Sequence, residues 1–526
     1  MKKLVSIFVL FFLSVSLFAQ KTPHKIEVKI NGVKDTTLLL GYHYGPKKLV
    51  SDTIWVDSKG RGTFAGDSLL DGGLYLILTP DYRYFEVMID NPDQTFKLET
   101  DTTDLIGNLK IEGSESNSVF LQYQKKSSEM YKIRKPAIEQ LKALHAEDTS
   151  KFNKKRLEAR RDSIERYRKT IDSVRDVMTD YENNIIKQYP TSLLASILGC
   201  THEVEIPDYP RDENGNITDS LFKYTYMKNH YFDNINLGDE RLLRTPVYES
   251  KLDDYFDKQL FQIPDSIIPQ VDFLMNRILK QENKGYEGKM YYNTLHHLFM
   301  KYQNPKYMGL DNIFVHIMET YYINGHVPAR VVNDTAYMNK IKDRYAKMVH
   351  NQIGVNAVDM LLYKMGQDTL DEHMGWTRLS LVKSNYIVLY FWDTDCGHCK
   401  KIIPEWHKLY RENEFKKKGV ESFLVYTQTD MDKWKKFIAE KDMFDFINVF
   451  DPYQNTNFRT FYDIYSTPVV YVLNKERKII AKRLPPETVV EVLNRELERD
   501  AKEAEKAIGR PLLGSVPSSR SPALNF

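Results

Sequence analysis

Alternating apolar and polar positions run through the N-terminal part of the chain. Ile26, Val28 and Ile30 alternate with charged residues, and similar runs follow at residues 53–56, 73–78, 84–89 and 95–99. A period of two is typical of strands with one buried face, and the Asp, Gly and Pro residues between the runs are typical of turns. Several short strands at this spacing favour a small antiparallel β-sandwich, which we expect over residues 20–114.

A helical period replaces this alternation over residues 115–350. Between residues 150 and 188 apolar side chains repeat with the spacing of a heptad seam, at Leu157, Ile164, Tyr167, Ile171, Val174, Met178, Tyr181 and Ile185. Such a seam predicts a long coiled-coil-like helix. The helix could form a homodimer or pack in a hairpin on the helix expected near residues 117–145, and we favour the hairpin.

A buried-strand pattern followed by two cysteines stands out in the last third of the chain. The apolar run Tyr386–Trp392 precedes Cys396-Gly397-His398-Cys399, and a helical pattern follows. A helix N-terminus carries unpaired N–H groups and about half a positive charge, which together stabilise a thiolate. We therefore expect Cys396 to be a nucleophile of lowered pKa, helped by protonated His398. Cys399, one turn further along, would resolve the mixed disulfide.

A zinc half-site is the alternative interpretation of this cysteine pair. Zinc needs about four ligands, and no second Cys-x-x-Cys or closely spaced His pair accompanies the motif. The strand-to-helix placement favours redox chemistry, so we expect neither a metal nor a cofactor. The chain has three cysteines in all, and the third, Cys200, lies in an apolar context that predicts a buried, inert thiol.

A proline heads a strand-like run about 70 residues after the cysteines. Ser466-Thr467-Pro468 is followed by the apolar residues 469–473. A proline cannot donate to a β-ladder and is tolerated at the first residue of a strand. An ordinary loop proline would give the same pattern, but a cis X–Pro bond is typical of a tight turn. Taken with the cysteines, the pattern favours a cis bond at Pro468.

Together these segments resemble a thioredoxin-fold domain. The stretch Cys396 to Trp406 is similar to the active site of protein disulfide isomerases, and the layout through Pro468 resembles bacterial thioredoxin-like proteins of the TlpA type. The resemblance covers roughly residues 351–500. It implies that Cys396 attacks, that Cys399 resolves, and that the backbone of Thr467 beside Pro468 pairs with a bound peptide. We also count Trp392 among the substrate-binding residues.

Three positions depart from the pattern of the resembled families. Asp395 stands where Trp usually precedes the first cysteine, and an acid there would raise the pKa of Cys396. Tyr390 replaces a buried carboxylate, and Ile402 replaces a glutamate of some TlpA-type reductants, so no proton acceptor for Cys399 is evident. A peroxiredoxin is rejected because Asp393 occupies the place of its threonine, three residues before the cysteine.

Length and composition indicate a multidomain protein with an export signal. The chain has 526 residues and a net charge of +2, which gives no electrostatic reason to expect nucleic acid. Lys2 and Lys3 precede an apolar run of about 15 residues that ends before Ala19, which predicts a signal peptide at residues 1–19 and a soluble periplasmic protein. Residues 501–526 lack periodicity and predict a disordered tail.

The expected fold is therefore multidomain α+β, with an N-terminal β-sandwich, a central helical region and a C-terminal thioredoxin fold. The expected function is an exported thiol–disulfide oxidoreductase that acts on protein thiols and disulfides. Its direction, reductase or isomerase, stays open, and the TlpA-like layout suggests a membrane electron-donor protein as partner. The alternative is a peptide-binding or scaffold protein whose thioredoxin-like domain turns over little.

Overall fold

The computed structural model describes residues 24–90, 92–365 and 375–508 of the chain. Contacts divide the chain into two compact units. The first comprises the residues up to 261 together with 269–297, and the second comprises 262–268 and the residues from 298 onward. The predicted signal peptide at 1–19 lies outside the described residues. No helix among the described residues is both long and apolar enough to cross a membrane.

The first unit begins with two four-stranded sheets. One has the order β4 (Arg61–Gly66), β1 (His24–Asn31), β7 (Thr95–Asp101), β8 (Lys110–Glu112); the other has the order β3 (Lys47–Val56), β2 (Thr36–Tyr44), β5 (Gly73–Leu78), β6 (Tyr84–Ile89). The inward positions of both sheets, among them Ile26, Val28, Leu38 and Ile77, form one core. All pairings are antiparallel except that of β1 with β7, which is parallel because the chain crosses to the other sheet between them.

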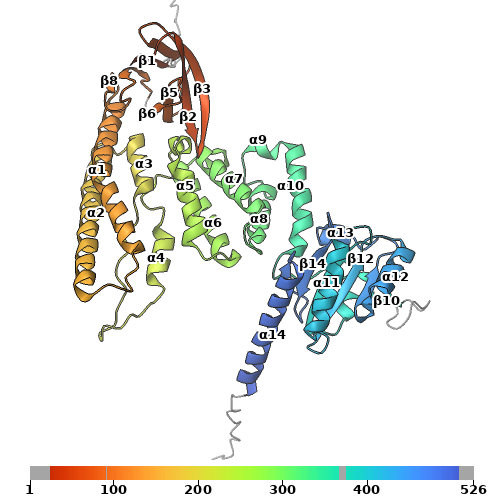
Figure 1. Cartoon of the computed structure of the whole chain (residues 1–526). Coiled ribbons are helices and arrows are strands. Elements are labelled where there is room, and N and C mark those ends of the chain that lie inside the picture. The colour runs from red at the N-terminus through yellow and green to blue at the C-terminus, as the bar shows by residue number, and fades with distance from the viewer. Residues whose placement is uncertain (1–23, 91, 366–374, 509–526) are drawn as a thin grey trace, which may run out of the picture. The chain divides into compact units, whose positions relative to one another are not determined.

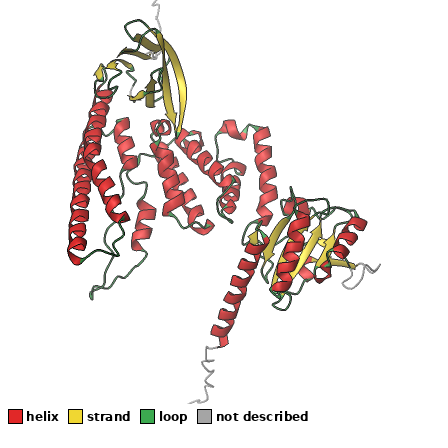
Figure 2. Cartoon of the chain, viewed as in Figure 1, coloured by secondary structure: helices red, strands yellow, loops and turns green. Residues whose placement is uncertain are grey.

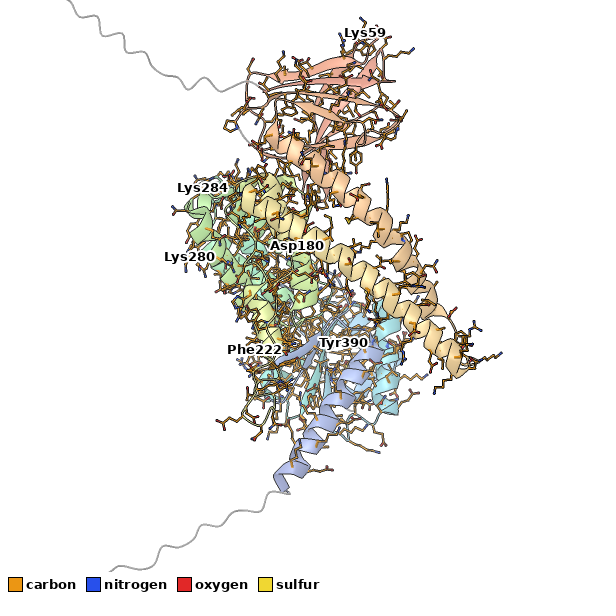
Figure 3. The ribbon with its side chains drawn as sticks, turned by 90° about the vertical axis from the view of Figure 1, so that its left-hand side faces the viewer. Lys59, Asp180, Phe222, Lys280, Lys284 and Tyr390 are labelled. Carbon is orange, nitrogen blue, oxygen red and sulfur yellow. The ribbon has the colours of Figure 1, made fainter. Side chains whose placement is uncertain are left out.

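Two long helices follow the sheets and pack on each other as a hairpin. They are α1 (Glu115–Ala146) and α2 (Lys154–Gln188). Val174 and Ile185 of the predicted seam are buried, as are Phe120 and Met130 of α1. Asp180 of α2 is labelled in Figure 3, which shows the two helices side by side from a second direction. The predicted hairpin is confirmed, because the seam of α2 meets α1 of the same chain.

Shorter helices occupy the rest of the central region, with strands confined to the two ends of the chain (Figure 2). They are α3 (Leu193–Thr201), α4 (Phe222–His230), α5 (Val247–Asp254), α6 (Pro264–Glu282), α7 (Lys289–Gln303), α8 (Asp311–Ile317), α9 (Ala329–Val332) and α10 (Thr335–Met348). Of these, α8, α9 and α10 belong wholly to the second unit.

The second unit is built around a seven-stranded mixed sheet. Its order is β10 (Gly375–Arg378), β9 (Leu361–Lys364), β13 (Ile447–Phe450), β12 (Val420–Tyr426), β11 (Tyr386–Trp392), β14 (Val469–Leu473), β15 (Ile479–Lys482). All seven residues of β11 are buried, because apolar clusters cover both faces of the sheet. β11 runs parallel to β12 and antiparallel to β14. The multidomain α+β class predicted from the sequence is confirmed.

Four helices accompany this sheet in the chain: α11 (Cys399–Glu412), α12 (Met431–Glu440), α13 (Phe458–Phe461) and α14 (Pro486–Ile508). The prediction of a disordered tail from residue 501 is wrong for residues 501–508, which continue α14. These eight residues contain neither Gly nor Pro and are mostly Ala, Glu and Lys, which are strong helix formers. The rest of the predicted tail lies outside the described residues.

Candidate active site

The two cysteines lie in the turn between β11 and the first residues of α11. β11 ends at Trp392, and α11 begins at Cys399, with His398 as the residue that precedes it. From the sequence we expect Cys396 at the N-terminal end of this helix. In the structure Cys396 lies three residues before the helix begins. Its sulfur still faces the helix end, because the Cys399 backbone N–H donates to Cys396 Sγ at 3.2 Å. Sγ thus takes the position of a capping side-chain oxygen.

The surroundings of the two thiols separate their acidities. Burial raises the pKa of the Cys396 thiol, but hydrogen bonds with Cys399, Thr467 and the His398 backbone outweigh it, so the pKa lies below its usual value. Burial, together with the hydrogen bond to Cys396, raises the pKa of Cys399 to about 12. Both cysteines are free thiols, Cys396 half-buried and Cys399 fully buried. Cys396 is therefore the more acidic thiol of the pair and Cys399 the less acidic one.

The loop before β14 meets the reactive sulfur. The Thr467–Pro468 peptide bond is cis, as predicted. Cys396 Sγ donates to the Thr467 carbonyl oxygen at 3.1 Å, although the two residues are 71 positions apart in the sequence. The structure thus brings together Cys396, Cys399, Thr467 and Pro468. His398 is adjacent and exposed, and it acts on Cys396 through its backbone N–H.

The C-terminal part of the chain is similar to known proteins. Residues 353–482 match the model of the AhpC/TSA family. The chain is 32% identical to a domain of a possible thiol-disulfide isomerase from Cytophaga hutchinsonii, covering 29% of this chain and 96% of that chain, with a TM-score of 0.25. The C-terminal domain belongs to the thioredoxin-like thiol–disulfide oxidoreductases. Residues 24–120 and 168–351 match two domain families of unknown function.

Two further solved structures resemble this chain, one over 56% of its length and the other over 28%. A thioredoxin-like protein from Bacteroides caccae is 18% identical and covers 56% of this chain and 98% of its own, with a TM-score of 0.39. The thioredoxin domain of a thiol-disulfide oxidoreductase from Bacteroides vulgatus is 24% identical and covers 28% of this chain and 97% of its own, with a TM-score of 0.25. No curated protein matches the chain.

Trp392 does not belong to the substrate-binding surface of the oxidoreductase domain. Its side chain is 0% exposed, and its ring packs against Tyr426 and Phe437, with centroid distances of 5.6 and 5.0 Å. The prediction that Trp392 contacts substrate is wrong. The last residue of β11 points into the core cluster that also contains Phe437 of α12, and a period-two pattern cannot assign an outer face to a strand buried on both sides.

Asp395 has a partner that sequence reasoning missed. Its carboxylate lies 2.9 Å from Lys433 Nζ on α12, and this ion pair raises the pKa of the Lys433 amine. The neighbouring Asp393 accepts the Asp395 backbone N–H at 2.8 Å and the Gln428 side-chain amide at 2.6 Å. Lys433 therefore offsets the acid beside Cys396. No local signal could identify it, because it comes from another element 38 residues away.

Tyr390 occupies the interior of the oxidoreductase sheet, where the resembled families keep a carboxylate. It is 1% exposed and is labelled in Figure 3. Among the described residues its hydroxyl has no hydrogen-bond partner, and burial raises the pKa of that hydroxyl above its usual value. A phenol in this state is neither a strong proton acceptor nor a charge that would raise the pKa of Cys399.

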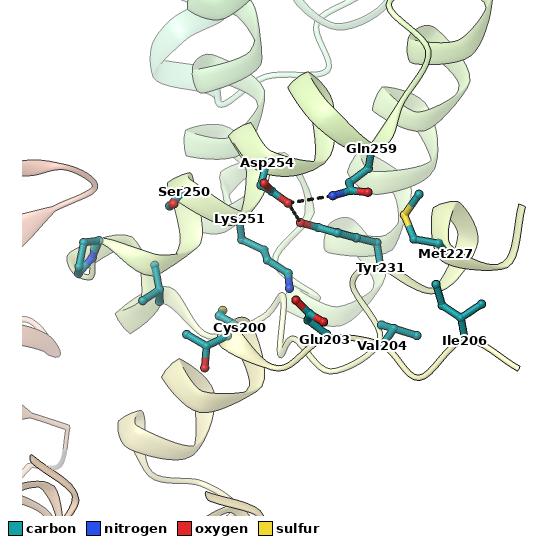
Figure 4. A pocket seen from close by; sticks show the side chains of 13 residues that line it. Cys200, Glu203, Val204, Ile206, Met227, Tyr231, Ser250, Lys251, Asp254 and Gln259 are labelled. Atoms are coloured by element: carbon teal, nitrogen blue, oxygen red, sulfur yellow. Dashed lines mark hydrogen bonds between the residues drawn. The ribbon is translucent and has the colours of Figure 1, made fainter. Parts of the chain in front are cut away.

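Cys200 lies apart from this chemistry, in the first unit. It lines a cavity of about 590 Å³ together with Lys251, Tyr231 and Asp254, and Figure 4 shows these side chains. The thiol is 1% exposed, and burial raises its pKa to about 12. Lys251 donates to the His202 carbonyl oxygen at 3.2 Å. The buried state predicted for Cys200 is confirmed, and a thiol of this pKa is a poor nucleophile.

Within the described ranges, no group of three or more His, Cys, Asp and Glu side chains converges as metal ligands would. His407 of α11 is buried, and its Nε2 lies 3.2 Å from an Asp445 carboxylate oxygen. Its partner is a carboxylate of another segment rather than a cysteine.

Proposed function

We propose that the protein is an exported thiol–disulfide oxidoreductase of the TlpA type that exchanges disulfides with protein substrates through Cys396 and Cys399. The observation that carries the proposal is the asymmetry of the two thiols. Cys396 Sγ accepts the Cys399 N–H at 3.2 Å and its pKa is lowered, whereas the pKa of buried Cys399 is raised to about 12. The lowered pKa of Cys396 suits the thiol that attacks and later leaves, whereas Cys399, with its raised pKa, attacks only once its proton has been removed.

The exchange takes place in two steps. The Cys396 thiolate attacks one sulfur of the substrate disulfide; that S–S bond breaks, a substrate thiolate leaves, and a mixed disulfide forms. The departing substrate thiolate takes the proton of Cys399, the Cys399 thiolate attacks the Cys396 sulfur, and the mixed disulfide breaks so that the second substrate sulfur leaves as a thiolate. The protein is oxidised by two electrons and the substrate is reduced by the same two. The reverse sequence oxidises a substrate dithiol.

The position of the Thr467 carbonyl supports the proposal that the substrate is a protein. The carbonyl lies 3.1 Å from Cys396 Sγ, so a backbone that pairs with the loop at Thr467 would present its disulfide to the thiolate. Extended peptides bind by such main-chain pairing with exposed backbone. A peroxidase mechanism has less support, because the Thr394 hydroxyl is buried and pairs with the Tyr426 hydroxyl at 3.3 Å.

Substitution of each cysteine in the full chain tests the proposal. Cys396→Ser should abolish reduction of insulin by dithiothreitol above the uncatalysed rate, because it removes the nucleophile. Cys399→Ser should accumulate mixed disulfides with substrate, which mass spectrometry would detect. Cys200→Ser is the matched control and should keep full activity, since that thiol belongs to another unit. Catalysis that survives in the Cys396 variant would exclude the proposal.

The reduction potential of the Cys396–Cys399 pair measures the direction of exchange. A value of about −180 mV or higher is that of isomerases and oxidants, whereas about −270 mV is that of thioredoxin. The first result would mean that the protein oxidises or reshuffles clients. The second would mean that it reduces them and draws electrons from a membrane donor protein.

A second candidate function is a peptide-binding scaffold with little turnover. Tyr390 favours it, because the position of a proton-accepting carboxylate holds a buried hydroxyl without a partner among the described residues. The two functions differ in kcat. A scaffold would bind a peptide near Thr467 equally well in the wild type and in the double Cys396→Ser, Cys399→Ser variant, and would reduce insulin no faster than dithiothreitol alone.

Export and assembly are also part of the proposal. Cleavage of residues 1–19 and recovery in the periplasm are tested by N-terminal sequencing of the mature protein after cell fractionation. A homodimer through the central helix is tested by light scattering. The α1–α2 hairpin already covers Val174 and Ile185 of that seam, whereas Leu157 and Val177 stay exposed on α2.

A further inference from the structure

The turn that leads to the cis-proline is held by a helix from outside the sheet. Asp463 accepts hydrogen bonds on both carboxylate oxygens from Arg344 Nη1, each at 3.1 Å, and one from Arg483 Nη2 at 3.0 Å. Arg344 belongs to α10, and Arg483 directly follows β15. The Asp463 side chain is 14% exposed, whereas that of Arg344 is 44% exposed. This is a three-member charge cluster rather than an isolated surface pair.

Two residues that follow α10 contact the segment just before Asp463. Asn351 donates from Nδ2 to the Phe461 carbonyl oxygen at 3.1 Å. The His350 ring meets the Phe461 ring edge-on, with a centroid distance of 5.2 Å. Phe461 ends α13, two residues before Asp463. The whole stretch from α13 to Asp463 is therefore attached to residues 344–351, within the second unit of the chain.

The attached stretch runs directly into the reactive loop. Thr467, whose carbonyl lies 3.1 Å from Cys396 Sγ, is four residues after Asp463. Tyr465 lies between them and is 99% exposed. Asp463 itself has a φ of +49°, a left-handed conformation that costs free energy for a residue other than glycine. The Arg344 and Arg483 contacts hold the backbone in this conformation.

We propose that Arg344 is a positioning residue for client binding. Through Asp463 it holds residues 463–468 in the arrangement in which the Thr467 backbone meets an extended polypeptide that carries a disulfide. This inference rests on the proposed oxidoreductase function and deepens it. The ligand class is an extended protein segment, since a small disulfide needs access to Cys396 Sγ alone and does not use the loop.

The test compares protein and small-molecule disulfides in the full chain. Arg344→Met keeps the aliphatic stem and removes the guanidinium, and Lys342→Met is the matched control, because it removes an exposed cation from the same helix. Arg344→Met should raise the KM for insulin about fivefold with kcat nearly unchanged, because uniform binding is lost. Its rate with 5,5′-dithiobis(2-nitrobenzoate) should stay that of the wild type. Lys342→Met should change neither.

Two further variants separate positioning from stability. Asp463→Asn keeps the size and tolerates a positive φ, so it should raise the KM as Arg344→Met does. The double variant should be no worse than Asp463→Asn alone, because that substitution already removes the ion pair with Arg344, together with that of Arg483. Arg344→Lys keeps the positive charge without the planar guanidinium, so its affinity for insulin should lie between those of the wild type and Arg344→Met.

Two results would overturn the inference, and a third would refute the proposed function instead. An insulin KM for Arg344→Met equal to that of Lys342→Met would overturn the inference. An equal loss with insulin and with the small disulfide, accompanied by a lowered Tm, would also overturn it and assign Arg344 a structural role. A wild-type chain without Cys396-dependent turnover would instead refute the proposed function on which the inference rests.

Discussion

The Asp395 carboxylate lies 2.9 Å from the Lys433 ammonium, next to the cysteine that the neighbouring backbone activates. Both side chains are more than half exposed, so solvent weakens the pair. The pair nevertheless places a positive charge against the one carboxylate that adjoins Cys396 in the sequence. Lys433 is therefore the counter-charge of the acid that adjoins Cys396, while burial and hydrogen bonds account for the shift of the Cys396 pKa.

Lys433→Gln should raise the pKa of Cys396. The substitution leaves Asp395 without its counter-charge, and a nearby negative charge disfavours the thiolate. Because an exposed ion pair contributes at most about 1 kcal/mol, the increase should be on the order of half a pKa unit. The ultraviolet absorbance of the thiolate, followed against pH, measures it. Asp395→Asn in the same background should cancel the increase, and a pKa that Lys433→Gln leaves unchanged would contradict this account.

Alkylation should separate the two thiols by pH. A thiol reacts as its thiolate, so lowering a pKa extends reactivity to lower pH and raising it restricts reactivity to higher pH. In the reduced protein, iodoacetamide should modify Cys396 near neutral pH, whereas Cys399, with a pKa of about 12, should remain unmodified. Peptide mapping by mass spectrometry identifies the modified residue. Modification of Cys399 ahead of Cys396 would reverse the assigned roles.

The same shifts predict how stability depends on pH. The folded pKa of Cys396 is lowered, so its contribution is present above the unfolded pKa and is lost as the pH falls through the folded value. The folded pKa of Cys399 is raised, so its contribution is present below the unfolded pKa and is lost as the pH rises towards about 12. Denaturant titrations of the reduced wild type and of Cys399→Ser, from neutral to alkaline pH, should differ most at the alkaline end.

Tyr465→Ala should weaken client binding without affecting the fold. Tyr465 is 99% exposed and lies two residues before Thr467, so its ring is free to pack on a bound polypeptide. The KM for insulin should rise about threefold, within the range that an exposed aromatic contact supplies, and the Tm should not change. Tyr453→Ala is the matched control, because Tyr453 is also exposed but stacks on Trp376. An equal effect of both substitutions would indicate no specific role for Tyr465.

Lys482→Met should strongly destabilise the second unit. Lys482 Nζ lies 2.5 Å from an Asp311 carboxylate oxygen and 2.8 Å from the Asn351 carbonyl oxygen, and its side chain is 7% exposed. Loss of the amine leaves a largely buried carboxylate without its charge partner, which costs about 3 kcal/mol. Denaturant unfolding of the full chain measures this loss. The double variant with Asp311→Leu should recover most of it, whereas an unchanged midpoint for Lys482→Met would contradict the prediction.

Local patterns in the sequence were sufficient to propose the chemistry of the site. A strand followed by Cys396 and Cys399 predicts a redox pair, because the backbone N–H groups of the following helix lie within a few residues of the first sulfur. The cis bond at Pro468 was also predicted from adjacent residues. Trp392 was misassigned for a physical reason: a strand whose residues are all apolar carries no signal that separates a core position from a surface position.

The sequence by itself thus determined which two thiols are proposed to react, the class of the fold and the long central helix, since each depends on neighbours in the chain. Only the tertiary structure decided that α2 packs on α1, that Lys433 pairs with Asp395 and that Arg344 holds Asp463. These contacts join residues that are tens to more than a hundred positions apart. A charge on an exposed helix face has the same local pattern whether it faces water or a carboxylate of another element, so only the fold reveals its partner.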